Sequence, residues 1–165
     1  MLFVYYLEFV ILVLFIPFMR VVLQKVKKAK VKVGGQTVGQ ISHGFLLLIA
    51  IKKGDTREKA DYLVEKICKL RLFSDAGRNS FMEKNILEVG GEVLLVSQFT
   101  LYGDCKKGTR PSFTESEEPE KAKEMYEYFV EQMKKQIEKV ETGRFAEHME
   151  VSLVNAGPIT IILER

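Results

Sequence analysis

Apolar and basic residues alternate near the start of the chain. Residues 20–33 have the sequence RVVLQKVKKAKVKV, and their second half repeats every two positions. This period is typical of a strand with one face in the core and one in solvent. Gly34 and Gly35 follow, and two adjacent glycines readily adopt the positive φ angles of a two-residue hairpin turn. Residues 44–51, GFLLLIAI, form an unbroken apolar run that predicts a buried strand.

Two later segments carry the spacing of amphipathic helices. We predict a helix within residues 54–73, with Asp55 as its N-cap, and a second helix with Pro119 in its first turn and Ser116 or Glu118 as its cap. Side chains on the apolar stripes are predicted to pack in the core. They are Ala60, Leu63, Val64, Ile67 and Cys68, then Ala122, Tyr126, Phe129, Val130, Met133, Ile137 and Val140.

The remaining segments complete a mixed pattern. Residues 74–85 are predicted to be a polar loop, and residues 90–103, GGEVLLVSQFTLYG, a strand bounded by glycines. The final run, SLVNAGPITIIL, is apolar but contains Gly157-Pro158, and proline is normally excluded from central strands. A turn between two short strands is the simple interpretation of this step. The order of elements predicts a single mixed α/β domain.

The N-terminus differs from the rest of the chain. Residues 1–18, MLFVYYLEFVILVLFIPF, contain Glu8 as their only charged residue. A spanning helix needs about 20 apolar residues, so this stretch is borderline for one. We expect Met19 to be the true start, with residues 19–165 as the domain. The alternative is a membrane anchor whose basic flank, from Arg20 onward, stays in the cytoplasm.

Composition narrows the chemistry. The 165 residues carry a net charge of +3, which permits a nucleic-acid partner without requiring one. Cys68 and Cys105 are far apart and are expected to be free thiols, and His43 and His148 are isolated. We therefore predict neither a disulfide, a metal site nor a cofactor.

Three polar stretches are candidates for function. Ser97, Gln98 and Thr100 follow the apolar run VLLV, and buried polar side chains need partners, so structural hydrogen bonding is one explanation. The second stretch is NAGPIT at residues 155–160. The third, KKGTRPSF at residues 106–113, is either a solvated loop or a phosphate-binding patch with a stacking ring.

SQFTL and NAGPIT together resemble the paired motifs of the bacterial D-aminoacyl-tRNA deacylases, also called D-tyrosyl-tRNA deacylases. The resemblance runs from Met19 to the C-terminus and includes MRVVLQKV, KGTRPSF and ETGRF. It departs in DAGRNSFMEKN, where Glu83 stands at a position expected to hold Asn. Residues 1–18 have no counterpart.

The resemblance implies a fold of mainly antiparallel sheets with a barrel-like core and flanking helices. It also implies a homodimer with both active sites at the subunit interface, and a cis Gly157-Pro158 peptide that enters the partner's pocket and excludes L residues. The implied catalytic residues are Ser97, Gln98, Phe99 and Thr100. The implied substrate pocket is Asn155, Ala156, Gly157, Pro158 and Thr160, and the implied tRNA contacts are Lys106, Lys107, Arg110 and Phe113.

The implied reaction is cytoplasmic hydrolysis of the ester in D-aminoacyl-tRNA, and of mischarged glycyl-tRNA, without a metal. Either Thr100 attacks, or the 2′-hydroxyl of the substrate assists water; we favour the second because an unactivated hydroxyl is a poor nucleophile. Gln98 and the N–H groups of Phe99 and Thr100 would stabilise the oxyanion, and Ser97 would hold the terminal adenosine. Arg20 and the lysines of residues 25–32 would contact phosphates. A membrane-tethered, non-catalytic RNA-binding module is the alternative.

Overall fold

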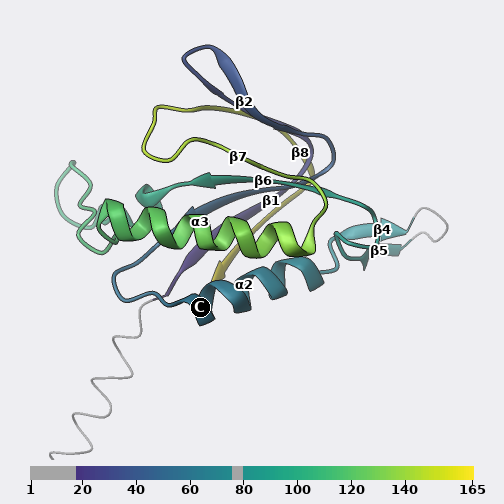
Figure 1. Cartoon of the computed structure of the whole chain (residues 1–165), viewed down its shortest axis with the longest axis horizontal. Coiled ribbons are helices and arrows are strands. Elements are labelled where there is room, and N and C mark those ends of the chain that lie inside the picture. Colours follow the sequence, from purple (N-terminus) through teal and green to yellow (C-terminus); the bar gives the residue numbers. More distant parts are fainter. Residues whose placement is uncertain (1–17, 76–79) are drawn as a thin grey trace, which may run out of the picture.

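The computed structural model describes residues 18–75 and 80–165, so the predictions for residues 1–17 lie outside the described residues. A six-stranded sheet has the order β2-β1-β3-β6-β7, and β8 also pairs with β1 (Figure 1). In the described part of the chain, two α-helices and a separate two-stranded sheet complete the fold. The elements are β1 (Arg20–Val33), β2 (Gln36–Ile41), β3 (Gly44–Ala50), α2 (Arg57–Lys69), β4 (Phe73–Asp75), β5 (Ser80–Lys84), β6 (Glu92–Ser97), the 3-10 helix η1 (Phe99–Tyr102), α3 (Pro119–Gln136), β7 (Val140–Thr142) and β8 (Glu150–Glu164).

The long strand β1 organises the sheet. Its first half pairs with β3, its second half pairs with β2, and β8 runs antiparallel along its whole length. The β1–β2 hairpin turns at Gly34 and Gly35, with φ of 55° and 81°, as predicted. β2 and β7, at opposite ends of the strand order, contact each other, so the sheet curves into a nearly closed barrel. The predicted mixed α/β, barrel-like fold is confirmed.

Two parallel pairings set the position of the helices. β6 pairs in parallel with both β3 and β7, and parallel neighbours need crossover connections, which α2 and α3 provide. Both helices lie side by side on one face of the sheet (Figure 1). Their apolar stripes pack there around Phe45 and Phe129. A second cluster around Val31, Leu46 and Leu94 fills the other side of the sheet.

The helices follow the predicted stripes except at one cap and at Val140, which lies in β7 beyond the end of α3. α3 begins after Glu118, with Pro119 in its first position, as predicted. The prediction of Asp55 as an N-cap was wrong, because Thr56 occupies that position. The Asp55 carboxylate instead accepts the backbone N–H of Lys52 at 2.7 Å and pairs with Lys59 at 3.3 Å, which closes the turn before the helix. Burial raises the pKa of Asp55, although these contacts oppose the shift.

Three strand predictions also need correction. Residues 74–85 are not simply a loop, because they contribute to β4 and β5. The strand predicted over residues 90–103 covers only Glu92–Ser97, and the chain then turns into η1. The final apolar run belongs to one continuous strand, β8, and not to two short ones. Within residues 18–75 and 80–165, no helix is long and apolar enough to cross a membrane.

Candidate functional site

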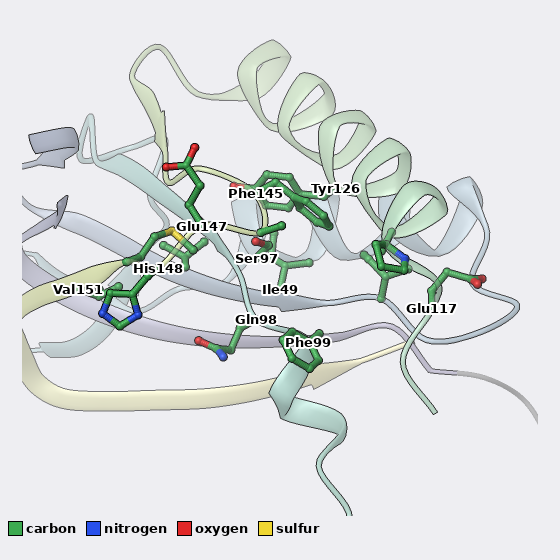
Figure 2. A pocket seen from close by; sticks show the side chains of 16 residues that line it. Ile49, Ser97, Gln98, Phe99, Glu117, Tyr126, Phe145, Glu147, His148 and Val151 are labelled. Atoms are coloured by element: carbon green, nitrogen blue, oxygen red, sulfur yellow. The ribbon is translucent and has the colours of Figure 1, made fainter. Parts of the chain in front are cut away.

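A cavity of about 540 Å³ opens where β6 ends, between the start of α3 and the loop that precedes β8. Figure 2 shows the rings of Tyr126 and Phe145 above Ser97, with Gln98 and His148 together on one side and Glu117 on the other. The lining residues are Ile49, Ile51, Val96, Ser97, Gln98, Phe99, Glu117, Pro119, Ala122, Tyr126, Phe145, Ala146, Glu147, His148, Met149 and Val151.

The first motif reaches this pocket because the chain leaves the sheet there. Ser97 is the last residue of β6 and pairs with Ile49, whose carbonyl then accepts the N–H of Gln98 at 2.7 Å. Ser97 and Gln98 are half-buried, whereas Phe99 and Thr100 are exposed. Ser97, Gln98 and Phe99 line the pocket, but Thr100 does not. The expectation that Thr100 is buried was therefore wrong.

Backbone and side-chain contacts hold η1 at the pocket edge. The Ser116 hydroxyl donates to the carbonyl of Phe99 at 3.2 Å, and Arg20 donates to the carbonyl of Leu101 at 2.6 Å. The Gln98 amide donates to the hydroxyl of Thr100. Phe99 therefore stands on a tethered turn, although its own side chain is 58% exposed.

An aromatic wall closes one side of the pocket. The rings of Tyr126 and Phe145 are 6.0 Å apart, and the Tyr126 hydroxyl donates to the carbonyl of Leu95 at 2.9 Å. Burial raises the pKa of Tyr126, so the phenol stays protonated. The helical stripe predicted Tyr126 as a core residue, and it is one. The stripe gave no sign that the same ring also lines a pocket.

Charged and ionisable groups stand at the rim. Glu117, Glu147 and His148 all line the pocket, and Arg144 pairs with Glu147 at 3.7 Å. From the sequence, His148 was expected to be isolated. It reaches the pocket because the loop between β7 and β8 folds back over the end of β6, and no local spacing could have indicated this contact.

The second motif forms a wide bulge in β8. Asn155 pairs with Val26 and Thr160 pairs with Gln24, so residues 156–159 lie opposite Lys25 alone. A proline is tolerated at such a bulge because no ladder hydrogen bond is required of it. Gly157 has φ of 124°, and the Gly157-Pro158 bond is cis, as the resemblance implied.

Two side chains of the motif brace this bulge. The Asn155 amide oxygen accepts the N–H of Ile159 at 3.1 Å, and its nitrogen donates to the hydroxyl of Thr160 at 3.1 Å. Gln24 donates to the same hydroxyl at 3.4 Å. Between these braces, Ala156 is half-buried, and Gly157 and Pro158 are exposed.

Within one chain the two motifs do not form a common pocket. None of the residues predicted from the second motif (Asn155, Ala156, Gly157, Pro158 and Thr160) lines the cavity that Ser97, Gln98 and Phe99 line.

The basic loop lies beside the first motif. Backbone hydrogen bonds between Asp104 and Ser112, at 2.8 and 3.0 Å, close the loop that carries Lys106, Lys107 and Arg110, all exposed. At its end, the ring of Phe113 meets that of Phe99 edge-on, with centroids 5.1 Å apart. Phe113 is half-buried, so it supports Phe99 from behind.

Two predicted phosphate contacts are engaged elsewhere. Arg20 pairs with Glu164 at 2.6 Å, and the ammonium of Lys25 donates to the carbonyl of Leu72 at 2.7 Å and lies over the ring of Phe73. Burial lowers the pKa of Lys25. The expectation that these two side chains face phosphates does not match their contacts, whereas Lys27 and Lys28 are exposed.

Among the described residues, no group of three or more His, Cys, Asp and Glu side chains is arranged to hold a metal ion. The pocket lining combines the Ser97 hydroxyl and the Gln98 amide with aromatic rings and with the ionisable groups at the rim.

Fold and site together define a small α/β protein with a curved sheet, two crossover helices and an open, aromatic-lined pocket at the end of a parallel strand. The chain belongs to the D-Tyr-tRNA(Tyr) deacylase family, which it matches over residues 22–164. This confirms the family indicated by the two motifs.

Individual relatives agree with this assignment. The D-aminoacyl-tRNA deacylase of Thermosipho africanus is 53% identical over 146 residues, which are 88% of this chain and 97% of that protein. The protein of the same name from Halalkalibacterium halodurans is 51% identical over 146 residues, 88% of this chain and 99% of that one.

Solved structures also share the fold. A protein described as c-Myc DNA Unwinding Element Binding Protein is 36% identical, has a TM-score of 0.83, and matches 88% of this chain and 98% of its own. A probable eukaryotic D-amino acid tRNA deacylase is only 16% identical, so its TM-score of 0.79, over 90% of this chain and 100% of its own, concerns the fold alone.

Proposed function

We propose that the protein hydrolyses the ester bond of D-aminoacyl-tRNA and rejects L-aminoacyl-tRNA. The main support for this proposal is the pocket at the end of β6, which Ser97, Gln98 and Phe99 line. Its volume of about 540 Å³ suits a ligand of the size of an aminoacylated nucleoside. Purified protein should release D-tyrosine from D-tyrosyl-tRNA and leave L-tyrosyl-tRNA intact. Equal release from both substrates, or from neither, would contradict the proposal.

The complete site is shared between two copies of the chain. The bulge of β8 is exposed and braced, yet it lies outside its own chain's pocket. We infer that it enters the pocket of a second copy in a homodimer. Exposed apolar side chains on and near β8, such as Val154 and Ile162, support an interface on this side of the molecule.

Selection by handedness follows from the bulge. Carbonyl groups of residues 156–159 that do not bond to β1 are free to accept the α-ammonium group of the amino acid. A rigid backbone that holds the ammonium group leaves room for a side chain on only one side of the α-carbon. An L side chain would collide with this backbone and is therefore excluded. Glycine has no side chain and passes the same test, so we propose that glycyl-tRNA is also a substrate.

The chemistry requires an attacking water and stabilisation of an oxyanion. Water adds to the ester carbonyl, the tetrahedral intermediate collapses, and the ribose oxygen leaves with a proton. The first N–H groups of a helix have no acceptor within it, and those of Phe99 and Thr100 begin η1. Together with the Gln98 amide they are suitable oxyanion donors. Ser97 would hold the terminal adenosine, and the substrate's 2′-hydroxyl would assist the water.

Thr100→Ala is expected to lower kcat by no more than about 10-fold. The Gln98 amide points a donor at the Thr100 hydroxyl, and an amide cannot remove its proton, so the hydroxyl is not activated as a nucleophile. Alanine keeps the backbone N–H on which the oxyanion depends. Single-turnover deacylation of D-tyrosyl-tRNA measures this. A loss beyond about 1,000-fold with tRNA binding intact would favour attack by Thr100.

Replacing Lys106, Lys107 and Arg110 together by alanine is expected to raise KM and to weaken its dependence on salt. Each lost phosphate contact should reduce the slope of log KM against log salt by about one. The control is Lys66, Lys121 and Lys134 replaced by alanine, which removes the same charge from exposed helix positions. An equal effect of both triple variants would mean that net charge, and not this loop, binds the tRNA.

We propose a reaction in the cytoplasm without a metal, because no three His, Cys, Asp or Glu side chains among the described residues are arranged to hold one. A chelator such as EDTA should leave the rate unchanged. The membrane-tethered RNA-binding module is less well supported, because the chain belongs to a family named for an enzyme. The two are separated by assaying deacylation with protein that begins at Met19.

A further inference from the structure

We propose that Arg20, held by Glu164, is a positioning residue for deacylation, because it fixes the turn that presents Phe99 and Thr100. This inference rests on the deacylase function proposed above. Arg20 lies outside both sequence motifs and does not line the pocket. Its contact with the first motif runs through η1.

The guanidinium of Arg20 joins three elements. Its Nε and Nη2 atoms each lie 2.6 Å from the Glu164 carboxylate at the end of β8, and its Nη1 donates to the carbonyl of Leu101 in η1 at 2.6 Å. The same group stacks over the Tyr102 ring, 5.0 Å from its centroid. Arg20 itself sits on β1, where it pairs with Ala50 and Glu164. One side chain therefore ties η1 to the place where β1 pairs with both β3 and β8.

η1 needs such a tether. It has four residues, and short 3-10 helices have poorer hydrogen-bond geometry than α-helices. Its first two side chains, Phe99 and Thr100, are exposed, although the Phe99 ring meets that of Phe113. Tyr102 at the end of η1 is buried and donates to the carbonyl of Phe18, and two side chains from other elements hold carbonyls nearer the N–H groups of Phe99 and Thr100. Ser116 holds the carbonyl of Phe99, and Arg20 holds that of Leu101.

The planar fork of arginine is required for this role. The side chain donates at once to a carboxylate on one side and to a carbonyl on the other, and lysine offers no such fixed pair of donors. An arginine in these contacts is not presented to a phosphate. A displacement of about 1 Å at the reacting groups can reduce a rate by about 100-fold, so loss of the tether should be visible in kcat.

The test is the kinetics of D-tyrosyl-tRNA hydrolysis by Arg20→Met and Arg20→Lys at 25 °C. We expect kcat to fall by about 10- to 100-fold in Arg20→Met, with KM changed by less than about 3-fold. Arg20→Lys should restore less than half of the kcat that Arg20→Met loses. Glu164→Gln, which keeps the fork but removes the charge that holds it, should lower kcat by a few fold and remain informative if Arg20→Met fails to fold.

Arg57→Met is the matched control. Arg57 likewise pairs with a glutamate, Glu124 at 3.0 Å, and stacks over a tyrosine ring, Tyr128 at 4.9 Å, but it joins α2 to α3 away from the pocket. It should lower the midpoint of thermal unfolding and leave kcat unchanged. This separates a loss of stability from a loss of positioning.

Provided that the wild-type protein is active, either of two results would overturn the inference. If Arg20→Met resembles Arg57→Met, with unchanged kcat, Arg20 is only structural. If Arg20→Met raises KM in a salt-dependent manner with kcat unchanged, Arg20 contacts tRNA phosphate, as its place in the basic run predicts. An inactive wild type would instead contradict the proposed function itself.

Discussion

Gly157→Ala is expected to lower kcat/KM for D-tyrosyl-tRNA by about 100-fold. It should also reduce the ratio of kcat/KM for D-tyrosyl-tRNA to that for L-tyrosyl-tRNA. Gly157 has φ of 124°, which residues with a side chain rarely adopt. An added Cβ would lie 2.8 Å from Cγ1 of Ile159 and 3.1 Å from its backbone nitrogen. Ile159 is anchored in the core, so the bulge must move instead. A shift of about 1 Å is enough for such a loss of rate.

The control for this variant is Gly34→Ala at the β1–β2 turn. Gly34 also has a positive φ, 55°, but nothing lies within 4 Å of its added Cβ. Both variants should lose about 1–3 kcal/mol of stability through backbone strain. Only Gly157→Ala should lose activity. If its rates on both substrates match those of Gly34→Ala, the bulge takes no part in selection.

Subunit mixing then tests whether the site is shared. Gln98→Ala should be nearly inactive, because loss of one oxyanion donor costs about 100- to 1,000-fold in kcat. In a mixed dimer with Gly157→Ala, one pocket carries both substitutions and the other carries neither. After random exchange about half of the dimers are mixed, so about a quarter of wild-type activity should return. No recovery, despite exchange of subunits, would mean that each chain supplies its own bulge.

Phe99→Ala is expected to raise KM by about 10- to 100-fold, because stacking of one base on an aromatic ring contributes about 1–3 kcal/mol. Phe99 is suited to this role since its ring is 58% exposed, lines the pocket and is backed by Phe113. Truncation of so exposed a ring should change the free energy of unfolding by less than about 1 kcal/mol. Steady-state kinetics with D-tyrosyl-tRNA, beside a thermal unfolding curve, checks both statements.

Tyr62→Ala provides the matched comparison for Phe99→Ala. Tyr62 is 43% exposed on α2, outside the pocket, and its replacement should leave KM unchanged. A fall in kcat with an unchanged KM in Phe99→Ala would indicate that the ring positions the turn and does not stack on the substrate.

Local sequence patterns correctly predicted the strands, turns and helices whose conformation is determined by one dominant interaction. The period of two in β1, the glycine pair at its turn and the helical stripes all specify burial within a few residues, and the structure agrees. The predictions were wrong where another part of the chain supplies a competing contact. Asp55 resembles an N-cap in sequence, but the nearby N–H of Lys52 takes its carboxylate. Arg20 and Lys25 belong to a basic run, yet Glu164 and Leu72 engage them.

The sequence likewise predicted some residues of the candidate site and missed others. The motifs identified Ser97, Gln98 and Phe99, which line the pocket, but gave no indication of Phe145 or His148 on the opposite wall. Those residues arrive on a loop that follows the last crossover, so their position depends on the whole sheet. Thr100 was assigned to the same buried group by adjacency alone. The turn into η1 takes it out of the cavity.

By itself, the sequence determined the family, the strands and helices with strong periodicity, and the two motifs, because these depend on residue type and short spacing. The tertiary structure alone decided that the first motif lines a pocket and that the second forms an exposed bulge outside it. The physical reason is the pairing of β1 with three strands. That pairing sets the register in which residues 156–159 face a single residue, and no pattern within either strand encodes it.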